Sequence, residues 1–156
     1  MLRISLIATL ALVTAAPLLA EPTADESTPR FEEPRHAVTW RREELKDIER
    51  LVRQLRFDLV NNRDARGAEP RLEELAERAS GENLLPAFIE GSHGGGSEAR
   101  PRIWEEWQAF EAGFADLEAR VAALREAAEA EDYRLATREL SDLSLSCRSC
   151  HRRYRY

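Results

Sequence analysis

Apolar side chains recur at helical spacing in the first half of the chain. Spacings of seven, three, four, three and four residues place one series on a single stripe of a helix that ends near Asn61-Asn62. The series consists of Val38, Leu45, Ile48, Val52, Leu55 and Leu59. A shorter helix is predicted over residues 69–79, with Leu72, Leu75 and Ala79 facing inward. Pro70 suits its start, and Ser80-Gly81 suit its end.

The second half holds two longer series. One opens at Pro101 and alternates steps of four and three residues from Ile103 to Ala128, which predicts one unbroken helix. The other covers Tyr133–Tyr154 with the same alternation. The segment 91–101 holds four of the seven glycines and is predicted to be a loop. Narrow stripes joined by short links, without strand-like alternation, predict an all-α antiparallel four-helix bundle.

The N-terminus has a different character. Arg3 precedes an almost wholly apolar run from Ile4 to Leu19, and the small residue Ala20 follows. This pattern is typical of a signal peptide over residues 1–20, cleaved near Ala20. A single membrane anchor is the alternative, but the run is short for a span and no basic cluster follows it. Residues 21–34 are predicted to be a flexible lead-in and residues 35–156 the bundle, exported to the periplasm.

Composition narrows the function classes. The chain has 156 residues, enough for one domain, and its formal net charge of −6 argues against a general nucleic-acid binder. No segment after the N-terminal run is apolar enough to cross a membrane. The only methionine is Met1, so a processed chain would contain none.

A compact motif near the C-terminus carries the chemistry. Cys147, Cys150 and His151 form Cys-x-x-Cys-His, the pattern by which haem c is covalently attached. Residues three apart lie on one face of a helix, so both thiols can form thioethers to one porphyrin. His151 is then the predicted axial ligand to the iron, since neutral imidazole is a common proximal donor. Because both cysteines continue the inward stripe of their helix, the haem is expected between helices of the bundle.

Three other uses of the two cysteines are weaker. A structural zinc site needs four ligands, and besides His151 the chain offers only His36 and His93. A thioredoxin-like redox pair normally accompanies a βαβ unit, which the pattern lacks. A disulfide between residues three apart on a helix would be strained.

At this point the chain resembles a known family, the cytochromes c′, which are four-helix bundles with haem near the C-terminus. Residues 33–45, EPRHAVTWRREEL, are similar to the start of the family's first helix, with Trp40 and Arg42 in place of the usual Tyr and Gln. The glycine-rich loop that leads into Ile103-Trp104 and the final run from Cys147 to Arg155 also resemble the family's pattern.

The resemblance implies roles for residues outside the motif. It places Leu45 against the open face of the iron and implies a five-coordinate, high-spin iron that binds small diatomic gases. It pairs Arg41 with a haem propionate, with Arg42 as a possible assistant, and sets Arg155 beside the proximal face. For Arg42 a solvated surface position is the alternative, and Leu45 is equally a core leucine on its stripe.

Other candidate ligands to the iron are poorly placed. Without a methionine in the processed chain, methionine ligation is impossible. His36 lies about 13 Å from Leu45 along a helix, Lys46 points away from it, and His93 would need its loop to fold inward.

Two functions and one further class stay open on the sequence. The first is a periplasmic haem protein that binds nitric oxide or carbon monoxide and exchanges electrons. The alternatives are a plain electron-transfer cytochrome and a bundle without haem. No nucleophile–base pair stands out, so no enzymatic activity and no catalytic residue is predicted.

The predicted partners are small gases, an unidentified redox partner and a second copy of the chain. The resemblance implies a homodimer, and Leu51 and Phe57 lie off the predicted core stripe where they could form its face, unless they simply widen that stripe. A basic cluster near the C-terminus either complements the helix dipole or docks an acidic redox partner. It consists of Arg148, Arg152, Arg153 and Arg155. Nucleic acid and membrane are not expected partners.

Overall fold

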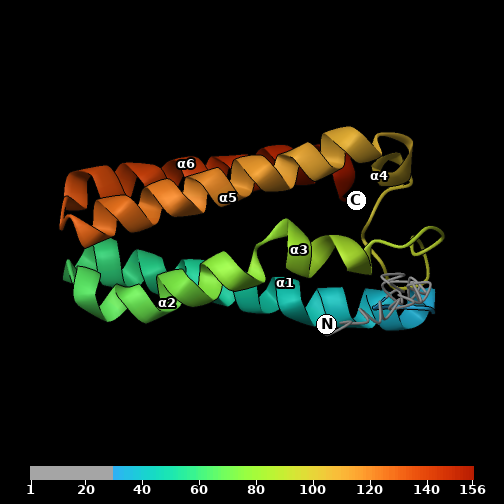
Figure 1. Cartoon of the computed structure of the whole chain (residues 1–156), viewed down its shortest axis with the longest axis horizontal. Coiled ribbons are helices and arrows are strands. Elements are labelled where there is room, and N and C mark those ends of the chain that lie inside the picture. Colours follow the sequence, from blue (N-terminus) through green and yellow to red (C-terminus); the bar gives the residue numbers. More distant parts are fainter. Residues whose placement is uncertain (1–29) are drawn as a thin grey trace, which may run out of the picture.

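The computed structural model describes residues 30–156, and the predicted signal peptide and most of the predicted lead-in lie outside this range. Four long helices form the bundle. They are α1 (Pro34–Arg56), α2 (Ala65–Arg78), α5 (Trp107–Glu129) and α6 (Tyr133–Tyr154). Figure 1 shows α1 and α2 in one layer and α5 and α6 in the other. The predicted all-α four-helix bundle is therefore confirmed.

Short elements join the long helices. A π-helical turn, Phe57–Asn62, extends α1, and Arg63 ends it in the left-handed region with φ 51°. Between α2 and α5 lie α3 (Gly81–Leu84), a 3₁₀ turn (Leu85–Ala87), an irregular glycine-rich loop and α4 (Arg102–Glu105). In the described residues no helix is both long and apolar enough to cross a membrane.

The main core fills the end of the bundle where α1 meets α2 and α5 meets α6. Leu51, Leu55 and Leu59 from the first helix pack with leucines of the other three, all almost fully buried. Burial of such side chains contributes about 1.5–3 kcal/mol each. Leu51 belongs to this core, so its predicted place on a dimer face was wrong and it widens the inward stripe instead.

A second, aromatic cluster closes the opposite end. Phe88, Ile103, Phe110 and Tyr154 are buried together there, and the rings of Phe110 and Tyr154 meet edge to face at 5.2 Å. The cluster draws on the segment after α3, on α4, on α5 and on the end of α6. It holds the last turns of α6 against the rest of the chain.

The predicted unbroken helix from Pro101 is divided in two. Glu106 leaves the helical region, with φ −123° and ψ 37°, and separates α4 from α5. At this break the Glu106 carboxylate accepts hydrogen bonds from Arg102 on α4 and from Arg153 at the end of α6, both at 2.8 Å or less. The Trp104 indole donates to the Phe88 carbonyl oxygen at 2.9 Å and fixes α4 in its own orientation.

The second helix begins earlier than predicted. Asp64 caps α2 by accepting a hydrogen bond from the Gly67 amide at 2.8 Å, so the helix starts at Ala65 and not at residue 69. Ser80 follows the end of this helix, as predicted, and its hydroxyl donates to the Glu77 carbonyl at 2.8 Å. The same hydroxyl also caps the next helix, accepting from the Asn83 amide at 3.1 Å.

Candidate functional site

The last turns of α6 present the two thiols. Cys147 and Cys150 lie one helical turn apart, both are free, and both are half-buried. Burial raises the pKa of each thiol, and for Cys150 the neighbouring Cys147 raises it further. At the end of the helix the Arg155 amide donates to the His151 carbonyl at 2.9 Å, and an isolated bridge pairs Arg155 with Ala99. The sequence-predicted pair is thus held on a fixed, capped helix end.

The His151 imidazole follows directly, and its pKa is lowered. Its outer edge is accessible to solvent, but the surrounding protein desolvates the ring and lowers its pKa, and the Arg155 charge acts in the same direction. Glu98 and Glu49 oppose this shift. Because Glu49 belongs to α1, its effect also shows that the imidazole lies within electrostatic reach of the first helix.

Leu45 on α1 offers apolar surface inside the bundle. It lies four residues after buried Arg41 and three before half-buried Ile48, which places it on the same stripe. Yet 40% of its surface is not covered by other residues of the chain. A large apolar side chain on an inward stripe with this exposure fits contact with a bulky apolar group.

Arg41 is buried, with 3% of its surface exposed, although it carries a charge. Its guanidinium donates to the Ala87 carbonyl at 2.8 Å, to the hydroxyls of Ser92 and Ser97 at 2.7 and 2.6 Å, and to the Ser92 carbonyl. These acceptors are neutral, and desolvation lowers the pKa of Arg41 to about 10. In the described part of the chain no carboxylate forms an ion pair with this buried cation. A haem propionate is a carboxylate that could pair with it.

The other predicted arginines lie at the rim. Arg42 is exposed, and its Nη1 lies 3.6 Å from where a Cβ on Gly96 would stand, so it runs along the glycine-rich loop. Gly96 has φ 93°, a backbone conformation that favours glycine. Arg155 forms an ion pair with Glu98. Arg153 forms one with Glu106 at 2.7 Å, so two members of the predicted basic cluster have carboxylate partners.

The alternative iron ligands lie elsewhere. His93 is exposed beside Trp104, with the ring centroids 5.5 Å apart. His36 is exposed next to Glu33, and Lys46 forms an exposed ion pair with Glu43 at 2.7 Å. All three side chains are therefore exposed, and each lies beside a residue other than Leu45. In residues 30–156 no group of three or more His, Cys, Asp or Glu side chains is arranged to hold a metal ion.

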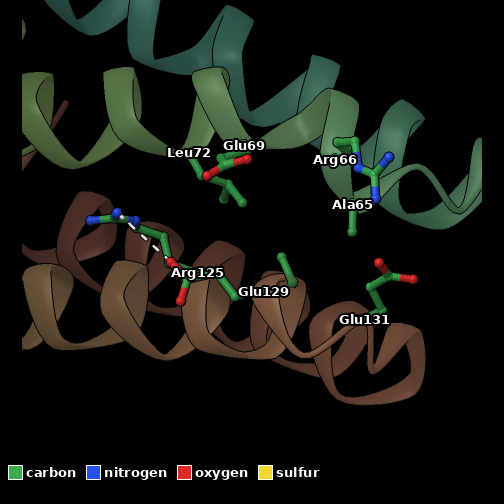
Figure 2. Close-up of a pocket in the computed structure, with 8 residues that line it drawn as sticks. Ala65, Arg66, Glu69, Leu72, Arg125, Glu129 and Glu131 are labelled. Atoms are coloured by element: carbon green, nitrogen blue, oxygen red, sulfur yellow. Dashed lines mark ion pairs between the residues drawn. The ribbon is translucent and has the colours of Figure 1, made fainter.

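A pocket of about 200 Å³ lies between α2 and α5, at the end of the bundle where α6 begins (Figure 2). Leu72 and Ala65 face it from α2, and Arg125 and Glu129 face it from α5, 3.9 Å from each other. No thiol or imidazole lines this pocket, and His151 lies near the other end of α6. It is separate from the site that the sequence predicted.

Comparison with known proteins agrees with this geometry. The family model described as Cytochrome C′ matches residues 36–155. The chain belongs to the cytochrome c′ family. Among solved structures, the nitrosyl complex of a variant cytochrome c prime from Alcaligenes xylosoxidans is 26% identical, with a TM-score of 0.72, covering 81% of this chain and 99% of its own. Cytochrome c prime from Shewanella frigidimarina gives 26% identity and the same TM-score over 80% and 98%. No curated protein matches.

Membership of the cytochrome c′ family confirms the predicted cofactor, one covalently bound haem c. The residues present fit that group, because α6 offers two free thiols one helical turn apart, followed by an imidazole whose pKa is lowered. Sequence reasoning missed the hydroxyl partners of Arg41. Ser92 and Ser97 lie in a glycine-rich loop without periodicity, and no local signal marks them as ligands of a side chain 51 and 56 residues away.

Proposed function

We propose that this chain is an exported haem protein that binds nitric oxide and carbon monoxide at a five-coordinate, high-spin iron. The haem supplies the iron on which a diatomic gas can bind. The observation that carries the proposal is the absence of methionine after Met1, together with the apolar residue Leu45 on the inward stripe. A solved relative of similar fold is a nitrosyl complex, which supports gas binding.

The residues of α6 would hold the cofactor. Cys147 and Cys150 would form its two thioethers, and His151 would be its axial ligand, because it follows them directly and its lowered pKa favours the neutral imidazole, which has one free nitrogen. Denaturing mass spectrometry of the protein from a host that matures c-type cytochromes should show one haem per chain. A bare polypeptide mass would contradict this assignment.

Leu45 would restrict access to the iron by its bulk and offer no hydrogen bond to a bound gas. Its nonpolar side chain favours nitric oxide and carbon monoxide over dioxygen, whose adduct is more polar and gains more from a donor. Arg41 would pair with a haem propionate, and Arg42 would lie at the rim of the site. Arg155 would lie near the side of the haem that His151 binds, because its backbone amide donates to the His151 carbonyl.

Spectra and kinetics test the open position. The ferric protein near neutral pH should give a high-spin EPR signal, and Leu45→Ala should speed carbon monoxide binding to the ferrous form. Val52→Ala on the same helix, two turns further on, is the matched control and should leave the rate unchanged. A purely low-spin ferric signal would instead favour an electron-transfer cytochrome with a sixth protein ligand.

The chain is also proposed to act as a homodimer. Phe57 and Val60, on the turn that extends α1, expose 58% and 42% of their surface. Exposed apolar side chains close together are typical of a contact surface between proteins. Sedimentation equilibrium should give the dimer mass for the wild-type protein and a weaker dimer for Phe57→Ser. Leu145→Ser, which alters exposed Leu145 on α6, should leave the dimer intact. A concentration-independent monomer mass for the wild type would exclude it.

Export to the periplasm rests on the N-terminal segment. A chain recovered from the periplasmic fraction should begin near Glu21, since cleavage is expected after Ala20. Recovery of a chain that still carries Met1 in the membrane fraction would support an anchor instead.

A further inference from the structure

The solvent-facing side of α6 carries a regular stripe of arginines. Its members recur at steps of four, three, four, three and four residues, so they share one face of the helix. We call this set the α6 outer stripe. It consists of Arg134, Arg138, Ser141, Leu145, Arg148 and Arg152, all exposed. The stripe spans about 27 Å along the helix at 1.5 Å per residue.

The carboxylates of α6 lie on a different side. Glu139 and Asp142 both raise the pKa of Arg120, which belongs to α5, so both lie within electrostatic reach of that helix. Ser146 likewise turns toward α5 and donates to Asp116 at 3.0 Å. Within residues 30–156, Arg138 is the one arginine of the stripe with a carboxylate at ion-pair distance, Glu139 at 3.7 Å. The stripe is therefore a basic surface on a chain whose net charge is −6.

Helix stability does not account for this arrangement. Cations near a helix C-terminus interact favourably with the macrodipole, and this effect explains Arg148 and Arg152. Arg134, however, is the second residue of α6, where a positive charge is unfavourable. Leu145 is 55% exposed in the middle of the stripe and contributes little to the core. An apolar centre flanked by exposed arginines is the composition of a protein–protein contact surface.

We propose that the α6 outer stripe docks an acidic electron-transfer protein. The inference rests on the proposed function, because the stripe matters for electron exchange only if haem is attached to α6. Arg148 and Arg152 flank Cys150 and His151 in the sequence, so a partner on the stripe approaches the same turns of helix that would hold the cofactor. On a chain whose net charge is negative, the stripe is a positively charged surface that attracts an acidic partner.

Oxidised flavodoxin, a small acidic electron carrier, is the probe. Isothermal titration calorimetry of the haem-loaded protein at 20 mM NaCl should detect binding that weakens at 200 mM NaCl. The double variant Arg148→Glu/Arg152→Glu should bind flavodoxin about tenfold more weakly or worse. The control Arg56→Glu/Arg66→Glu makes the same change in net charge with exposed arginines of α1 and α2, and should retain affinity within about threefold.

Several outcomes would overturn the proposal. If both double variants weakened flavodoxin binding equally, only the net charge would matter. If flavodoxin did not bind at low salt, the outer stripe would not be its docking surface. Tighter binding to phosphatidylglycerol vesicles than to flavodoxin, lost in Arg148→Glu/Arg152→Glu, would assign the stripe to a membrane surface. Haem content by denaturing mass spectrometry separates the two hypotheses: absent haem contradicts the proposed function, whereas intact haem without flavodoxin binding contradicts only this inference.

Discussion

Replacement of Arg41 by leucine should loosen the connection between the first helix and the glycine-rich loop. The guanidinium donates four hydrogen bonds to Ala87, Ser92 and Ser97, all of which lie between α3 and α4. Arg41→Leu keeps an apolar stem on α1 but removes every donor. The buried acceptors of the loop then lose their partners or must be reached by water.

The magnitude follows from the buried hydrogen bonds. Bonds to a charged group contribute about 1.5 kcal/mol each at the lower end of their range, a figure that already includes the loss of contacts with water. The four together therefore stabilise the fold by about 6 kcal/mol. Burial disfavours the charged guanidinium and lowers the pKa of Arg41 to about 10, and a buried leucine avoids this cost. Arg41→Leu should lower the free energy of unfolding by about 3–6 kcal/mol.

Urea denaturation followed by circular dichroism measures this loss, and amide hydrogen exchange at Ser92 and Ser97 should show faster opening of the loop. Arg42→Leu is the matched control, because Arg42 is the next residue, is exposed, and should change stability by less than about 0.5 kcal/mol. If the two variants unfolded at the same urea concentration, the buried network would not stabilise the protein and the reasoning would be refuted.

Three further outcomes follow from the packing and the charges. Leu55→Ala, at a fully buried position, should lower the free energy of unfolding by about 2–5 kcal/mol in urea titrations. Leu45→Ala should lower it less, because 40% of the Leu45 surface is not covered by the rest of the chain. Ser80→Ala should cost about 1 kcal/mol through loss of the α3 cap, against no measurable change for exposed Ser141→Ala. The Arg153 and Arg102 hydrogen bonds lower the pKa of Glu106 from 4.5 to about 2, so its stabilising contribution is complete above pH 4.5 and is lost as the pH falls toward 2. Stability curves over this range should therefore be shallower for Glu106→Gln, and identical curves would contradict the ion pairs.

The sequence by itself determined the helical class, the number of long helices and the chemistry of the cofactor site. Apolar residues spaced three and four positions apart form one stripe on a helix, and that stripe must be buried. The pattern depends only on residues that are close together in the sequence. The spacing of Cys147, Cys150 and His151 is equally local, since one helical turn brings the two thiols to one face. The lack of methionine beyond Met1 needs no structure at all.

Only the tertiary structure decided which contacts override these local patterns. Glu106 interrupts a regular apolar alternation, and its carboxylate accepts a hydrogen bond from Arg153, 47 residues later in the chain. Leu51 lies off the predicted stripe but is buried, because neighbouring helices cover a wider arc of α1 than the stripe suggested. Ser92 and Ser97 become partners of Arg41 across more than fifty residues. Such contacts depend on how the folded helices and loops are placed relative to one another, and no periodicity in the chain records that placement.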